Sequence, residues 1–184
     1  MSIKGYRASD QSDHPIRIDQ STNTLQGIDY AHHEVHAGSH FEYSDLITLG
    51  LGATQDYIIT TPNTAKWAHM VFELWGSAIT TFELFEATAR AGIALQSVFN
   101  SNRNSANLPT TTVHKGSGAG ADGTRILVLG GGSASGQFRG GTSHGNGEEI
   151  ILRANTKYIL RVTSGTAANN ICLAMEWYEH TNIA

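Results

Sequence analysis

Short runs of alternating apolar residues, broken by turn-forming residues about every 8 to 14 positions, are the feature that most constrains how this chain can fold. In residues 68–76 every second residue is apolar, and residues 171–177 repeat the pattern. The members of these two sets are Ala68, Met70, Phe72, Leu74, Ile171, Leu173, Met175 and Trp177. A period of two places such residues on one face of a β-strand. The sequence therefore predicts an all-β chain, folded as a single β-sandwich or jelly-roll-like domain.

Further candidate strands are rich in β-branched and large apolar residues. They are residues 55–61, 95–99, 110–114 and 125–129. Residues 149–153 and 157–163 flank a three-residue connection that is compatible with a hairpin, in which Tyr158, Leu160 and Val162 would share a face. Residues 80–85 also match a helical capping box, but we favour a strand there. These runs predict about eight or nine strands.

Residues 1–27 are polar and show no sustained period, so they predict an extended arm in front of a domain at residues 28–184. Such an arm is a candidate assembly element. Its candidate contact residues are Tyr6, Arg7, Ile16, Arg17 and Ile18. Within the domain, 12 of the 20 glycines lie between residues 116 and 147, which predicts long glycine-rich loops crowded at one end of the sandwich.

Charge and cysteine content exclude several classes of function. The formal net charge is −4, so the chain has no global positive field to attract nucleic acid or an anionic membrane. Cys172 is the only cysteine, which rules out an internal disulfide and predicts a buried thiol in the core. No run resembles a secretory signal or a membrane span, so we expect synthesis in a cytoplasm.

Four of the nine histidines lie in residues 32–40, and this segment is the strongest candidate for a metal site. On a strand, His32, Glu34 and His36 would point to one side, and with His40 they could bind Zn, Mn or Fe(II). The spacing matches neither H-E-x-x-H nor H-x-H. The alternative is a set of structural histidines in a subunit contact. We favour the alternative and expect no metal and no cofactor.

The remaining motifs do not predict an enzyme. Residues 118–123 match G-x-G-x-x-G, but a strand-like run follows where a dinucleotide site needs a helix. There is no G-x-S-x-G elbow. The Asn-rich loop at residues 100–107 could hold a glycan or a partner through Asn102, Arg103 and Asn104, although turn formation explains it equally well.

Residues 28–36, the loop at 100–107, and the segments 155–164 and 176–180 together resemble virion structural proteins of tailed bacteriophages, in particular capsid decoration (cement) proteins. The resemblance covers roughly residues 28–180 and leaves the arm outside it. It implies a sandwich or jelly-roll body, a homotrimer, and binding to the major capsid protein on the outer surface of the virion. It implies no catalytic residues.

Three functions therefore remain as hypotheses. The first is a decoration protein that stabilises contacts between capsid subunits. The second is a head or tail fibre module that binds a host surface glycan through its Asn- and Gly-rich loops. The third is a metal-dependent, cupin-like enzyme that uses His32, Glu34, His36 or His40.

Overall fold

The computed structural model describes residues 4–6, 13–15, 30–134, 136–141 and 149–181. The chain divides into two compact units, Met1–His33 and Glu34–Ala184. In the first unit, strands β1 (Lys4–Tyr6) and β2 (Asp13–Pro15) pair antiparallel. Tyr6 lies in β1, whereas the other arm candidates, Arg7, Ile16, Arg17 and Ile18, lie outside the described residues.

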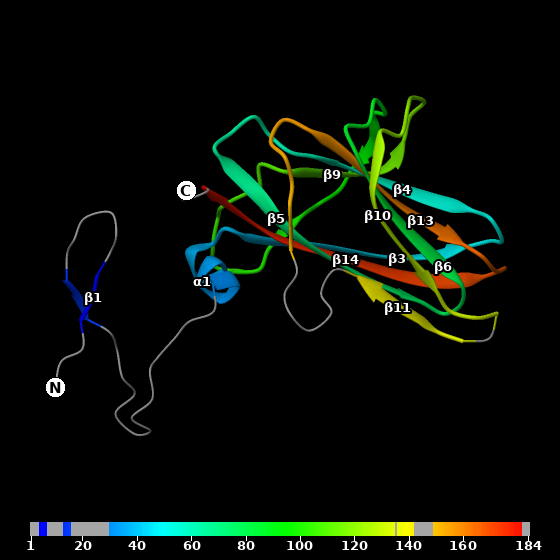
Figure 1. The fold of residues 1–184 in the computed structure, drawn as a ribbon, viewed down its shortest axis with the longest axis horizontal. Coiled ribbons are helices and arrows are strands. Elements are labelled where there is room, and N and C mark those ends of the chain that lie inside the picture. The colour runs from blue at the N-terminus through cyan, green and yellow to red at the C-terminus, as the bar shows by residue number, and fades with distance from the viewer. Residues whose placement is uncertain (1–3, 7–12, 16–29, 135, 142–148, 182–184) are drawn as a thin grey trace, which may run out of the picture. The chain divides into compact units, whose positions relative to one another are not determined.

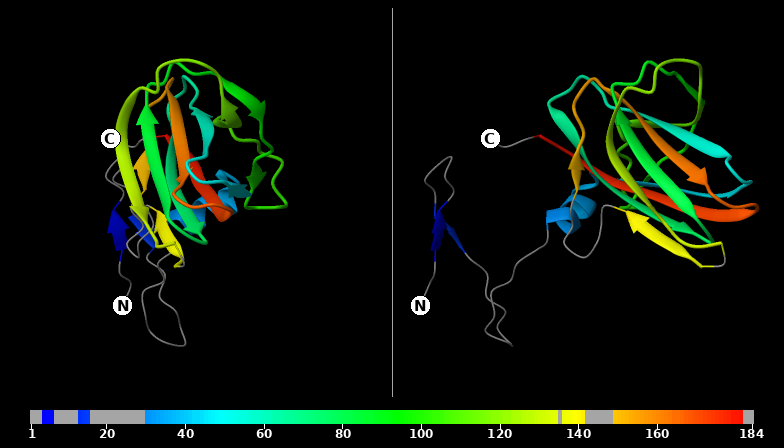
Figure 2. Two further views of the ribbon diagram at one scale, coloured as in Figure 1. Left: turned by 90° about the vertical axis from the view of Figure 1, so that its right-hand side faces the viewer. Right: turned by 45° about the vertical axis from the view of Figure 1, so that its right-hand side comes forward.

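The second unit is a β-sandwich of two antiparallel six-stranded sheets (Figures 1 and 2). One sheet has the order β10-β6-β13-β4-β9-β7, and the other has the order β11-β5-β14-β3-β8 with β12 also paired to β5. We call them the β13 sheet and the β14 sheet after their central strands. The predicted all-β sandwich is thus confirmed. The bounds are α1 (Tyr30–Ala37), β3 (His40–Leu49), β4 (Thr54–Thr60), β5 (Lys66–Gly76), β6 (Thr80–Glu86), β7 (Gly92–Leu95), β8 (Phe99–Asn100), β9 (Thr112–Ser117), β10 (Thr124–Gly131), β11 (Phe138–Gly141), β12 (Ile150–Ile151), β13 (Lys157–Ser164) and β14 (Asn169–Thr181).

Alternating side chains of the central strands build the core between the sheets. All eight alternate residues named for 68–76 and 171–177 are buried, and the predicted set Tyr158, Leu160 and Val162 is buried with them. In β14, Trp177 stacks at a tilt against Phe41 of the neighbouring strand β3, with 6.0 Å between ring centroids. The period of two therefore identified the core-facing side of these strands correctly.

Three local predictions are wrong. Residues 149–153 and 157–163 do not form a hairpin, because β12 pairs with β5 in one sheet and β13 pairs with β4 and β6 in the other. The run at 95–99 is mostly the crossing between β7 and β8, which lie in different sheets. Residues 30–37 form helix α1 and not a strand. The hairpin error replaced a long-range pairing with a local one, whereas at residues 30–37 a strand was expected where a local helix forms.

Candidate functional site

The histidine-rich segment does not bring its predicted metal ligands together on one strand face. Helix α1 contains His32, Glu34 and His36, and it ends at Gly38, whose φ of 73° closes a turn with hydrogen bonds from Gly38 N to Val35 O and from Ser39 N to Glu34 O. In this helix Glu34 is buried and accepts a hydrogen bond from Ser39 Oγ, while His32 and His36 are exposed.

His40 lies beyond the helix, in β3, with its Nδ1 2.7 Å from Ser101 Oγ. Burial lowers the pKa of His40, against the opposing influence of Glu42 and Glu34. Among the described residues, no group of three or more His, Cys, Asp or Glu side chains is arranged to hold a metal ion.

The Asn-rich loop uses its amides to hold the end of α1. Asn100 Nδ2 donates to Gly38 O at 2.9 Å, and Asn107 Nδ2 donates to the same oxygen at 3.1 Å. The side chains of Asn100 and Asn102 accept hydrogen bonds from backbone amides two residues further on, which is the local turn chemistry of asparagine. The loop candidates Asn102 and Asn104 therefore lie in these turns, and Arg103 lies over the Phe99 ring at 5.1 Å.

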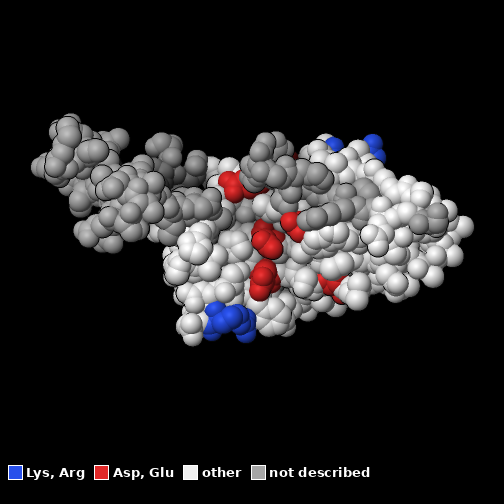
Figure 3. All heavy atoms as spheres, turned by 90° about the horizontal axis from the view of Figure 1, so that it is seen from below, with Lys and Arg blue, Asp and Glu red and all other residues white. Residues whose placement is uncertain are grey.

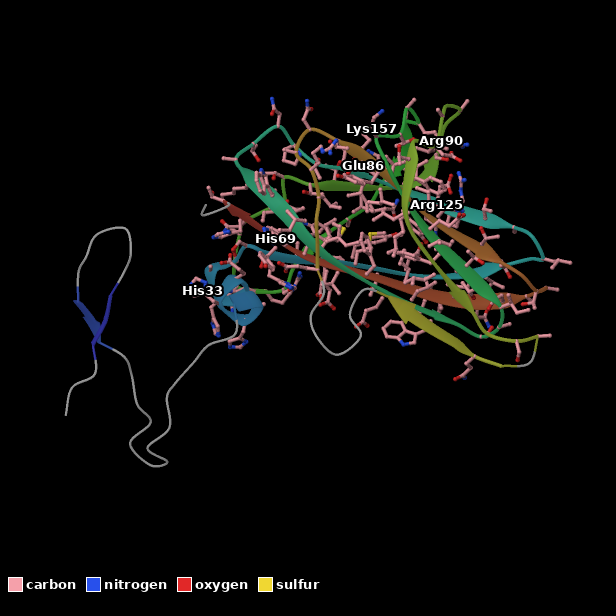
Figure 4. All side chains as sticks on the ribbon, viewed as in Figure 1. His33, His69, Glu86, Arg90, Arg125 and Lys157 are labelled. Atoms are coloured by element: carbon pink, nitrogen blue, oxygen red, sulfur yellow. The ribbon has the colours of Figure 1, made fainter. Side chains whose placement is uncertain are left out.

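A polar cluster around Glu149 joins β5, β14 and the segment before β12. His69 Nδ1 lies 2.8 Å from Glu149 Oε1, and Tyr178 Oη donates to both oxygens of the same carboxylate. The His69 and Tyr178 rings stack with centroids 4.6 Å apart. The cluster holds Glu149, and with it β12, at the edge of the β14 sheet, on the side of the sandwich where Figure 4 labels His69.

Another cluster, around Asp122, is a chain of ion pairs on the outer side of the β13 sheet. Arg161 donates to Asp56 through Nε and Nη2, at 2.8 and 3.0 Å, and to Asp122 through Nη1 and Nη2, at 2.8 and 3.1 Å. Arg90 Nε lies 2.6 Å from Asp122 Oδ1, the oxygen that also accepts from Arg161 Nη2. Hydrogen bonds from Arg161 lower the pKa of Asp122 despite its partial desolvation.

This ion-pair chain fixes a glycine-rich loop onto the sheet. Asp122 belongs to the connection between β9 and β10, and the backbone of Ala121 accepts hydrogen bonds from Ala89 N and Thr88 Oγ1. Lys157 Nζ also donates to Arg90 O at 3.1 Å, and Figure 4 shows these two residues at the same end of the sandwich. The first part of the predicted glycine-rich region is therefore held by specific contacts.

A buried carboxylate holds the chain that leads into β9. Glu179 is 5% exposed and accepts hydrogen bonds from the backbone amides of Thr110 and Thr111 and from Trp177 Nε1. A pocket of about 230 Å³ next to it is lined by Lys66, Asn107 and Leu108, among others. These hydrogen bonds hold the backbone at Thr110 and Thr111 against β14.

The outer faces of the two sheets differ at their central strands. On the β13 sheet, Ile58 and Ile159 are cross-strand partners. Because they alternate with core residues, they point to the outer side of the sheet, yet both are fully buried. On the β14 sheet, the outward residues of the central strands remain accessible. The accessible outward residues of this sheet are Glu42, Ser44, Leu46, Val71, Glu73, Phe99, Cys172, Ala174 and Glu176. Cys172 is partly exposed there, so its predicted burial in the core is wrong.

Comparison with known protein families, with curated proteins and with solved structures finds no match for this chain. In the described part of the chain, no helix is long and apolar enough to cross a membrane.

Sequence reasoning missed the residues that make the polar clusters. Asp56, Asp122 and Glu179 were not singled out, because their partners lie 105, 39 and 69 residues away along the chain. The sequence places Glu179 on the core-facing side of a strand and Asp122 within a glycine-rich stretch, whereas Asp56 lies on the outer side of the β13 sheet and had neither signal. Such a signal locates a buried charge without identifying its partner.

Proposed function

We propose that this chain is a decoration protein of a tailed-bacteriophage capsid, which binds the major capsid protein on the outer surface of the head as a homotrimer. The observation that carries the proposal is the two-unit organisation, in which a sandwich body follows a separate unit at residues 1–33. Attachment through two elements of one chain lets modest contacts add up through effective concentration.

The polar chemistry of the body agrees with a binding role. The three clusters around Glu149, Asp122 and Glu179 use their charged groups to hold strands and loops in place. Held in this way, the sandwich presents a sheet surface that needs little rearrangement on binding, and a small ordering cost favours affinity.

Co-sedimentation tests the proposal. Purified full-length chain is mixed with expanded capsids that lack it, prepared from a phage whose genome encodes it, and its mass is measured separately by light scattering. We expect saturable co-sedimentation, and the mass of a trimer for the free protein. Absence of binding to these capsids would refute the proposal.

A truncated chain tests the role of the arm. Deletion of residues 1–27 should abolish capsid binding while the thermal unfolding of the body stays unchanged. Full binding by the truncated chain would show that the sandwich attaches without the arm.

A further inference from the structure

The β13 sheet ends in an unpaired strand edge on each side. Among the described residues, β7 pairs only with β9, and β10, labelled in Figure 1, pairs only with β6. The outer side of such a strand presents backbone N–H and C=O groups, and a strand of another chain is the element that pairs with them. We call these two outer sides the β7 edge and the β10 edge.

Both edges carry exposed apolar side chains. In β7, Ile93 is 69% exposed, and Leu95 is exposed to a similar extent. In β10, Val128 is 50% exposed, and Ile126 is exposed at a β-bulge beside it. Exposed apolar groups that gather at one place on the surface indicate a contact with another protein.

The apolar side chains of the two edges lie on the same side of the sheet. Val128 follows Leu127, which packs against the core. In β7, Ala94 opposes Lys115, whose ammonium group points inward to an ion pair with the other sheet. Because side chains alternate along a strand, Val128 and the two neighbours of Ala94 all point to the outer face.

The two edges also match in direction and in level. All neighbouring strands of this sheet are antiparallel, so β7 and β10, with four strands between them, run in opposite senses. A second copy that continues the sheet therefore places its β10 antiparallel to β7. One row of cross-strand partners joins the middle of each edge: Leu127, Leu84, Leu160, Tyr57, Lys115 and Ala94.

Charge does not oppose contact between the two edges. Proteins commonly protect edge strands from association with charged side chains or proline. Strand β7 has neither, and the one charged residue of β10, Arg125, already lies 2.7 Å from Glu83 of the same sheet. By contrast, Figure 3 shows acidic side chains gathered along the middle of the surface seen from below, where contact between two copies would bring like charges together.

A homotrimer needs two different contact surfaces on each copy. A surface that pairs with itself gives a twofold dimer, whereas a threefold ring forms by head-to-tail contacts. The β7 and β10 edges form such a pair of surfaces. A stable interface uses roughly 20–30 residues on each side, and β7 has four, so each contact is modest. Closing the ring holds every copy by two contacts, which raises the stability of the assembly.

We propose that the β7 edge of one copy pairs with the β10 edge of the next copy, so that copies join head-to-tail through the β13 sheet. Ile93 and Leu95 then pack beside Val128 and Ile126 of the neighbouring copy. Three such contacts close the homotrimer, and in this respect the inference rests on the proposed function.

Lysine substitutions test the β7 edge in the full-length chain. Ile93→Lys with Leu95→Lys places two charges on this edge, and Leu51→Lys with Leu108→Lys is the matched control, because both leucines are exposed and lie outside the strands. In sedimentation velocity the unmodified chain and the control should be trimers. The β7 variant should associate at least about tenfold more weakly and sediment as a monomer. Circular dichroism should show the same β-structure in all three.

Mixing two variants tests which edges meet. Ile126→Lys with Val128→Lys blocks the β10 edge, and neither blocked chain should associate alone. An equimolar mixture of the two should form a dimer, because one chain keeps a working β7 edge and the other keeps a working β10 edge. Association of the β10-blocked chain with itself would show that β7 pairs with β7 and would overturn the proposal.

A disulfide captures the contact directly. After Cys172→Ser, the pair Ile93→Cys and Val128→Cys places one thiol at each edge. Within one copy these thiols lie about 20 Å apart, since neighbouring strands are about 4.8 Å apart and the two edges are five strand spacings apart, so only thiols of different copies can join. Oxidation should give covalent trimers.

The outcomes separate this inference from the proposed function. A trimer that survives the lysine substitutions and forms no disulfide would overturn the edge pairing while the decoration function stands. A monomeric unmodified chain would overturn both the edge pairing and the trimer. Absence of capsid binding by a trimer that is lost on blocking either edge would remove the function and leave the pairing in place.

Discussion

The Nζ of Lys115 lies 2.6 Å from the Oδ2 of Asp45, and this ion pair joins the two sheets of the sandwich. Lys115 belongs to β9 of the β13 sheet, and Asp45 belongs to β3 of the β14 sheet. Tyr57 Oη donates to the same carboxylate oxygen at 2.8 Å. Burial alone would raise the pKa of Asp45, but the hydrogen bonds from Lys115 and Tyr57 outweigh it and lower the pKa.

Replacement of this carboxylate should weaken the contact between the sheets. We expect Asp45→Asn to lower the free energy of unfolding by about 1–3 kcal/mol, because a hydrogen-bonded charge is lost from a half-buried site. Glu42→Gln, which removes a charge from the exposed position 42, should change stability by less than about 0.5 kcal/mol. Chemical denaturation of both variants measures the difference. Equal stabilities would mean that the pair contributes nothing to sheet packing.

The carboxylates of Asp45 and Asp122 should make the stability of the fold depend on pH in the acid range. The pKa values of Asp45 and Asp122 are both lowered in the folded chain, so their contribution to stability is complete above the ordinary aspartate pKa of about 3.9. It is lost as the pH falls below that value through the folded-state pKa. The unfolding midpoint should drop more steeply below about pH 4 for the unmodified chain than for Asp45→Asn combined with Asp122→Asn. Parallel curves for the two proteins would contradict the role of these carboxylates.

Arg161 should contribute more to stability than an exposed arginine in an ion pair. Its side chain is 17% exposed, and removal of the guanidinium leaves Asp56, whose side chain is 9% exposed, without its cationic partner. Arg161→Met should therefore cost about 3 kcal/mol, whereas Arg125→Met, at a 55% exposed position, should cost less than about 1 kcal/mol. Hydrogen exchange should also show loss of protection in residues 118–122 for Arg161→Met. Unchanged protection there would show that the loop is held by other contacts.

Gly123 should not tolerate a side chain. Its φ is 93°, and a Cβ at this position would lie 2.2 Å from Glu86 O. We expect Gly123→Ala to destabilise the fold by at least about 1–3 kcal/mol through backbone strain and this clash. Gly50→Ala is the control, because no atom lies within 4 Å of its Cβ position, and thermal unfolding compares the two. Similar midpoints would mean that the turn before β10 rearranges freely.

The alternation in residues 68–76 and 171–177 predicted both the strands and their buried faces, since side-chain direction in a strand depends only on local backbone geometry. The same reasoning failed at residues 30–37, where a period of two was assumed and Gly38 instead ends a helix with its positive φ. It also placed Cys172 in the core, although its position beside Ile171 and Leu173 puts it on the opposite, outer face.

The sequence by itself determined the class of fold, the core-facing residues and the polar character of the N-terminal segment, because these follow from local periodicity and composition. Only the tertiary structure decided which strands pair, which carboxylates meet which arginines, and which strands lie at the edges of the sheets. Those features depend on residues far apart in the chain, such as Asp56 with Arg161, and no local pattern encodes such a distance.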